Sequence, residues 1–143
     1  MRVRDVMTHK RRMVHTIAAG QTAEDAIVRM TEQQTSALIV MDGDTLLGIV
    51  TERDYARKVI LKGRGSETTR VEEIMSTQLI TATTEQTVRE CMTLMTEQRI
   101  RHLPVVAGDT VIGMISIGDL VKATIDEKDF VIDQLKQYIK GGR

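Results

Sequence analysis

The hydrophobic positions of this chain alternate between two periods, one typical of helices and the other typical of buried strands. From Thr22 to about Gln34, apolar residues recur at helical spacing after a threonine that can cap a helix. The continuous apolar run Ala37–Met41 predicts a buried strand, and Leu46–Val50 predicts its antiparallel return. Asp42-Gly43-Asp44 between them predicts a hairpin turn, because glycine supplies the positive φ that such turns need.

Two further segments complete this predicted unit. Val14–Ile17 predicts a short extended piece before the first helix, and Thr51 is expected to begin a helix that runs to about Lys62. The order of elements is therefore β-α-β-β-α.

The same arrangement recurs at a constant offset of 65 residues, which carries Gln21 onto Gln86 and Gly43 onto Gly108. The second copy predicts a strand, a helix, two hairpin strands and a further helix, at Leu79–Ala82, Thr87–Gln98, His102–Val106, Val111–Ile115 and 116–124. One unit of roughly 55 residues is too small to bury a comfortable core alone. We therefore expect two repeats related by a pseudo-twofold, with a deep groove between them.

The predicted fold class is α+β, two β-α-β-β-α repeats followed by a C-terminal amphipathic helix. That helix is expected over Asp126–Lys140, ending at Gly141-Gly142. Similar short segments precede the repeats, Val3–Thr8 and Val71–Ser76, with extra residues in the basic stretch His9–Arg12. The expected boundaries are 1–62 for the first repeat, 63–70 for a glycine-rich linker, 71–125 for the second repeat, and 126–143 for the helix and tail.

The composition narrows the class of protein. Lys plus Arg and Asp plus Glu both number 20, so a formal net charge of zero argues against a nucleic-acid partner, as do aromatics of only 2%. No apolar run approaches the ~20 residues of a membrane span, and no signal peptide is recognised. The single Cys91 rules out an intramolecular disulfide. We expect a soluble, cytoplasmic protein with no membrane contact.

The chemistry-bearing motif is Gly48-Ile-Val-Thr-Glu-Arg-Asp54, which recurs as Gly113-Met-Ile-Ser-Ile-Gly-Asp119. In each copy an apolar pair ends a strand, a hydroxyl residue can cap the next helix, and an aspartate follows three residues later. One interpretation is structural, with each motif acting only as a capping box. The other is functional, because a helix start suits a phosphate and a nearby carboxylate can accept ribose hydroxyls. Two copies in equivalent places favour the nucleotide interpretation.

These two motifs, together with Arg101-His-Leu-Pro-Val-Val106 and the register of the repeat, resemble a tandem pair of CBS (cystathionine-β-synthase) domains, or Bateman module. The resemblance covers nearly the whole chain. It implies binding of AMP, ADP or ATP, or of NAD(H) or S-adenosylmethionine, in the cleft between the repeats. It also implies a homodimer and regulation of a partner protein that the sequence does not identify.

The resemblance also implies site residues. It assigns Asp54 and Asp119 to the ribose diol and Thr51 and Ser116 to phosphate. Adenine would be read by extended segments through backbone groups and apolar packing, at Val14, His15, Thr16, Ile17, Ala37, Leu38, Leu79, Ile80, Thr81, Ala82, His102, Leu103 and Pro104. Ile39 stands where the second repeat has Pro104, so the two adenine pockets are expected to differ in shape.

The two clefts are also expected to differ in charge. Arg101-His102 aligns with Ser36-Ala37, and a guanidinium fork suits phosphate oxygens, so the cleft reached by Arg101 should take more phosphate. The alternatives are a solvated arginine and a packed histidine. His9–Arg12 could supply a second phosphate contact or form a solvated loop.

Catalysis has little support in the sequence. Cys91 lies on the apolar face of a helix, the three histidines lack metal-ligand spacing, and no nucleophile motif is recognised. We expect neither an enzyme nor a catalytic cofactor. The alternative to a nucleotide sensor is a structural dimerisation module. The apolar contacts of the expected homodimer would come from the helices, at Ala26, Ile27, Val59, Ile60, Cys91, Leu94, Leu120 and Val121.

Overall fold

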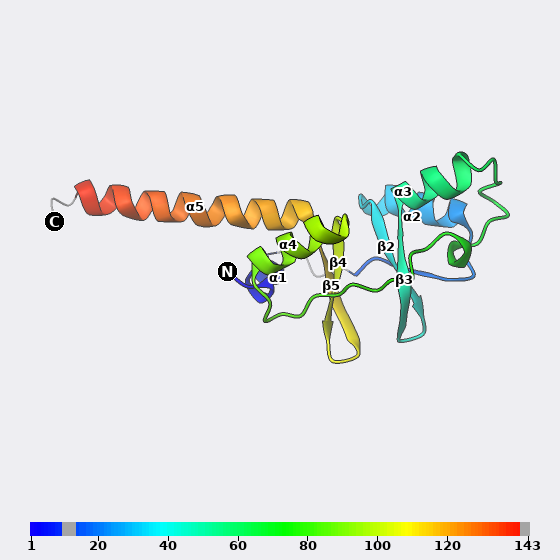
Figure 1. The fold of residues 1–143 in the computed structure, drawn as a ribbon, viewed down its shortest axis with the longest axis horizontal. Helices are drawn as coiled ribbons and strands as arrows, with labels where there is room; N and C mark the ends of the chain where they lie inside the picture. The colour runs from blue at the N-terminus through cyan, green and yellow to red at the C-terminus, as the bar shows by residue number, and fades with distance from the viewer. Residues whose placement is uncertain (10–13, 141–143) are drawn as a thin grey trace.

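Two β-hairpins, one from each repeat, lie side by side at the centre of the molecule (Figure 1). The computed structural model describes residues 1–9 and 14–140. Between the hairpins, Ala37 and Ile39 of the first repeat pack with Met114 of the second. The α+β class and the paired repeats are as predicted.

The first repeat follows the predicted order. β1 (Thr16–Ala18) pairs in parallel with β2 (Ala37–Asp42), which pairs antiparallel with β3 (Thr45–Thr51). Gly43 lies in the hairpin turn with φ of 58°, as the glycine predicted. The helices of this repeat are α2 (Ala23–Gln33), α3 (Glu52–Tyr55) and a π-helical turn (Ala56–Ile60).

The second repeat contains α4 (Val88–Gln98), β4 (His102–Ala107), β5 (Thr110–Ser116) and α5 (Ile117–Lys140). The strand predicted at Leu79–Ala82 is reduced to one bridge, between Ala82 and Val105. Pro104 explains the difference. In the first repeat the N–H of Ile39 donates to the carbonyl of His15 at 2.9 Å, whereas proline has no N–H to donate at the equivalent position.

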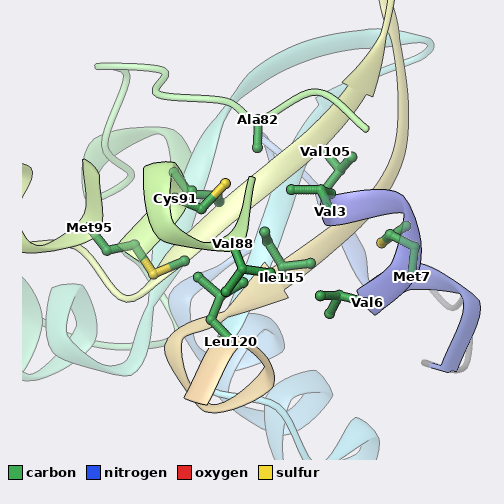
Figure 2. Close-up of a cluster of buried hydrophobic side chains, with 11 residues drawn as sticks. Val3, Val6, Met7, Ala82, Val88, Cys91, Met95, Val105, Ile115 and Leu120 are labelled. Atoms are coloured by element: carbon green, nitrogen blue, oxygen red, sulfur yellow. The ribbon is translucent and has the colours of Figure 1, made fainter. Parts of the chain in front are cut away.

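The short segments that precede the repeats are exchanged between the two cores. α1 (Val3–His9) places Val3, Val6 and Met7 in the core of the second repeat, beside Val105, Ile115 and Leu120 (Figure 2). The 3-10 turn Val71–Glu73 and Ile74 belong instead to the core of the first repeat. Each core therefore contains chain from both halves of the sequence.

The C-terminal part of the second repeat differs from the prediction. The helices expected at 116–124 and 126–140 form one continuous helix, α5, which extends away from the body of the molecule (Figure 1). No proline or glycine lies between Gly118 and Lys140 to interrupt it. The expected boundary at residues 125–126 lies inside this helix, and the predicted end at Gly141-Gly142 lies outside the described residues.

Four residues expected at a dimer surface are buried within the chain itself. Ala26 and Val59 are in the first core, and Cys91 and Leu120 are in the second. The apolar helix faces therefore turn toward their own sheets. Large apolar residues that remain exposed on the helices of the two repeats include Val28, Ile60, Leu61 and Val121.

Candidate functional site

A cavity of about 570 Å³ opens between the two repeats. Its volume is within the range of small-molecule sites. The first repeat contributes Ser36, Ile49 and the residues Thr51 to Asp54. The second contributes the extended segment before α4 and the start of β4, at Gln78, Leu79, Ile80, Arg99, Ile100, Arg101, His102 and Pro104, and Ser76 also lines the cavity.

The first motif forms the capping box that its spacing predicted. The Thr51 N–H donates to Oδ2 of Asp54 at 2.9 Å, and the Asp54 N–H donates to the Thr51 hydroxyl at 3.3 Å. The structural interpretation of the motif is therefore correct. The carboxylate nonetheless lines the cavity, and each of its oxygens can accept more than one hydrogen bond. Capping and ligand binding are compatible at Asp54.

Lys58 is a neighbour of Asp54 that the sequence analysis missed. Its ammonium lies 3.1 Å from Oδ1 of Asp54 and donates to the carbonyl of Ile74 at 2.9 Å. The i,i+4 spacing of a carboxylate and a lysine was the available signal. Lys58 thus holds the free edge of the carboxylate and ties it to the turn that follows the linker.

The second motif has the same cap but different surroundings. The Ser116 N–H donates to Oδ2 of Asp119 at 2.8 Å, and the Asp119 N–H donates to the Ser116 hydroxyl at 3.1 Å. Asp119 lines a cavity of about 630 Å³ with residues of α1 and α5. Ala123 stands where the first repeat has Lys58. Neither Ser116 nor Asp119 is among the described residues that line the first cavity.

Strand alternation decides which of the predicted adenine-reading residues face the cavity. His102 and Pro104 line it, whereas Leu103 between them is buried in the second core. Successive side chains of a strand point to opposite faces, so the two-residue spacing is expected. Neighbouring residues of one strand therefore cannot all face the cavity, although the sequence predicted them together.

Several other predicted adenine-binding residues do not line this cavity. Ile17 and Leu38 lie in the first core, and Ala82 lies in the second. Ala37 packs between the repeats, with Val14 against the same cluster. The carbonyls of His15 and Thr16 accept hydrogen bonds from Ile39 and Arg29. Thr81 is not among the described lining residues.

The backbone carbonyl of Ile80 differs in its hydrogen bonding from the equivalent carbonyl of the first repeat. Its position aligns with His15, whose carbonyl accepts from Ile39. Pro104 cannot donate the corresponding bond to Ile80, a residue that lines the cavity, so the Ile80 carbonyl lacks that ladder partner. A ligand amino group could donate to it instead.

The positive charge at the cavity exceeds what the sequence analysis expected. Arg101 and His102 line it as predicted, and Arg53 and Arg99 join them. Arg53 lies inside the first motif, and Arg99 is the left-handed C-cap of α4, with φ of 56°. Ser36 was assigned to the opposite cleft, but it lines this one and its hydroxyl lies 3.3 Å from Nε2 of His102. That assignment was wrong because β2 and β4 begin at the same place between the repeats. Residues 10–12 of the basic stretch His9–Arg12, and the His9 side chain, lie outside the described part.

Burial raises the pKa of the Cys91 thiol, which disfavours the reactive thiolate. Among the described residues, no group of three or more His, Cys, Asp or Glu side chains could hold a metal ion. Within the same residues, no helix has the length and apolar character needed to cross a bilayer.

The CBS domain family model matches residues 3–61 and 71–126. The chain is 45% identical over 126 residues to the mitochondrial CBS domain-containing protein CBSX3 of Arabidopsis thaliana, covering 85% of this chain and 61% of that relative's length. It is 32% identical to the CBS domain-containing protein YhcV of Bacillus subtilis, covering 82% of this chain and 81% of the relative. A solved structure of a protein with CBS domains from Burkholderia ambifaria has a TM-score of 0.86 at 49% identity, covering 88% of this chain and 95% of that one.

Proposed function

The chain belongs to the CBS-domain family, a family of regulatory modules, and we propose that it binds an adenosine nucleotide in the cavity between its repeats. One observation carries this proposal. The carboxylate of Asp54 in the first repeat and Ile80, Arg101 and His102 in the second line the same cavity. A single ligand there would contact both repeats.

Each part of an adenosine nucleotide has a suitable neighbour in the cavity. Asp54 has remaining acceptor capacity for a ribose hydroxyl, and the Ile80 carbonyl can accept from the adenine amino group. Arg53, Arg99 and Arg101 provide guanidinium groups for phosphate. Three arginines support ADP or ATP beside AMP, and NAD(H) or S-adenosylmethionine are the further candidates.

The nucleotide would act as a signal rather than a substrate. We propose that a ligand bridging the repeats changes how they sit against each other and that an unidentified partner protein senses the change. We expect no catalysis, catalytic cofactor, nucleic-acid partner or membrane contact. The cytoplasmic location also stays a prediction.

Thermal unfolding with AMP, ADP, ATP, NAD(H) and S-adenosylmethionine tests the proposal. A ligand present at 100 times its Kd should add about 2.7 kcal/mol to the free energy of unfolding. Calorimetry on the same ligands would then give the stoichiometry. Absence of both a thermal shift and binding heat for every ligand would contradict the nucleotide function.

The second candidate is a structural dimerisation module, which the two capping boxes favour because they give both motifs a role without a ligand. In either case we expect a homodimer. Its contacts on the repeats would come from exposed apolar residues such as Val28, Ile60 and Leu61. A purely structural module would show the dimer mass by light scattering but no response to nucleotide.

A further inference from the structure

The C-terminal half of α5 is an exposed helix beyond the part of the chain that matches the family. The match ends at residue 126, and α5 continues to Lys140 (Figure 1). Every side chain described from residue 125 to residue 140 is exposed. A helix of this length without packing partners is marginal in water, since most helical stability comes from burial of an apolar face. An additional contact would therefore stabilise it.

Five of the exposed apolar residues of α5 form a regular stripe, and the exposed Phe130 and Val131 lie outside it. The stripe consists of Val121, Ile125, Ile132, Leu135 and Ile139, and we call it the α5 stripe. Their exposed fractions are 42%, 53%, 48%, 56% and 74%. The spacing is that of a heptad, with isoleucine at the a positions, leucine or valine at d, and Lys128 at the remaining d position. This pattern is typical of a coiled-coil seam.

Leu120 and Thr124 join the start of α5 to the second repeat, and from Ile125 onward the side chains of the α5 stripe are exposed. The opposite face of the helix, with Asp119, Ala123, Asp126 and Phe130, borders a cavity shared with Met1, Asp5 and Val6. At 3.6 residues per turn, these positions lie roughly 180° around the helix from the stripe. From Ile125 onward the stripe is therefore open to another molecule.

The charges beside the α5 stripe match those of a second, antiparallel copy. Asp129 and Lys136 both occupy e positions, which face each other in antiparallel pairs. With Ile132 opposite Leu135 of the second copy, the two helices overlap from Lys128 to Ile139, and Val121 and Ile125 lie outside this overlap. Each Asp129 would then lie beside Lys136 of the second copy, and this pair would occur twice. In a parallel pair Lys128 would instead face Lys128 of the second copy within the seam, which is unfavourable. We propose that α5 pairs antiparallel with α5 of a second copy of this chain through the C-terminal part of the stripe, Ile132, Leu135 and Ile139.

Charge reversals in the full-length chain test this proposal. Asp129→Lys and Lys136→Asp should each weaken self-association roughly tenfold, because two attractive pairs become repulsive. The double variant Asp129→Lys/Lys136→Asp restores opposite charges and should recover the affinity of the parent. Asp133→Lys is the matched control, since it makes the same charge change at a b position away from the seam. Sedimentation equilibrium measures each dissociation constant.

A core variant separates pairing through α5 from any other interface. Leu135→Asp should remove one association step, lowering the mass by half at concentrations where the parent is assembled. Leu135 is exposed, so the fold should persist, and circular dichroism checks it. Equal masses for parent and Leu135→Asp at all concentrations would overturn the proposal. Loss of affinity without rescue in the double variant would overturn the antiparallel orientation. Binding of the parent to phosphatidylserine–phosphatidylcholine vesicles without self-association would assign the stripe to a lipid surface and overturn the second copy.

Discussion

The hydroxyl oxygen of Ser36 lies 3.3 Å from Nε2 of His102, so the two repeats meet through a side-chain contact where β2 and β4 begin. Both residues also line the cavity between the repeats. A ligand bound there would meet the two repeats where they contact each other. This arrangement gives a physical route from occupancy of the cavity to the relative position of the repeats.

Asp54→Ala should weaken AMP binding and also lower stability. Loss of a charge-assisted hydrogen bond to ribose should cost about 1.5–3 kcal/mol of binding free energy. Loss of the cap should cost ~1 kcal/mol of stability. Asp25→Ala is the matched control, because Asp25 closes the same capping box on α2 but does not line the cavity. Calorimetry and urea unfolding measure the two effects. If Asp54→Ala bound AMP as the parent does, the motif would be a cap alone.

Arg101→Ala should reduce affinity for ATP more than for adenosine, by about tenfold for ATP. The side chain is exposed at the cavity, so its contribution should shrink at high salt. Arg89→Ala on the exposed face of α4 removes the same charge away from the cavity and serves as control. Titration of adenosine, AMP and ATP at two salt concentrations measures the trend. Equal losses for all three ligands would assign Arg101 to the shape of the pocket.

Local patterns predicted most elements of the fold because each depends on nearby residues. The hairpin at Gly43, the caps at Thr22, Thr51 and Thr87, and the end of α4 all follow from a few adjacent positions. The constant offset of the repeat then gave the pairing of two similar units. The local patterns and the repeat therefore specify the same fold.

The features that the sequence did not reveal depend on contacts between distant segments. Val3–Thr8 and Val71–Ser76 carry similar apolar patterns, and nothing in either pattern says which core receives it. The sequence predicted part of the site, since Thr51, Asp54, Arg101 and His102 all line one cavity. Its remaining arginines could not be assigned, because exposed arginines are common and only the fold brings these together.

Glu73 should make stability depend on pH. The Arg70 N–H donates to its Oε2 at 2.6 Å, and Arg64 bonds to Oε1 at 2.6 Å. The bond from Arg70, and then the one from Arg64, holds the pKa of Glu73 below its ordinary value of 4.5. A depressed pKa means that the stabilisation is present above pH 4.5 and is lost as the pH falls through the folded-state pKa. Glu73→Gln should therefore destabilise the protein at pH 7 more than at pH 3. Urea unfolding measures this, with exposed Glu67→Gln as control. The same loss at both pH values would contradict it.

The two motif glycines should differ in their tolerance of a side chain. A Cβ at position 48 would collide with the backbone carbonyl of Ser76, which is fixed by its hydrogen bond from Ile49. A Cβ at position 113 would meet only the end of the flexible Met7 side chain. Gly48→Ala should therefore cost about 1–3 kcal/mol, and Gly113→Ala clearly less. Thermal unfolding of both variants measures these losses of stability. If Gly113→Ala lost as much stability as Gly48→Ala or more, the backbone at Ser76 would move aside more easily than the Met7 side chain.

Pro104→Ile should turn the single bridge at Ala82 into a strand and weaken nucleotide binding. Isoleucine restores an N–H that can donate to the Ile80 carbonyl, as Ile39 donates to His15 in the first repeat. A carbonyl engaged in the ladder is less available to an adenine amino group, so AMP affinity should fall by roughly tenfold, the value of one hydrogen bond. Hydrogen exchange of the new amide at position 104 reports the strand, and calorimetry reports the affinity. Ile39→Val, which keeps the N–H in the first repeat, is the control. A protected amide with unchanged AMP affinity would mean that the Ile80 carbonyl does not read the base.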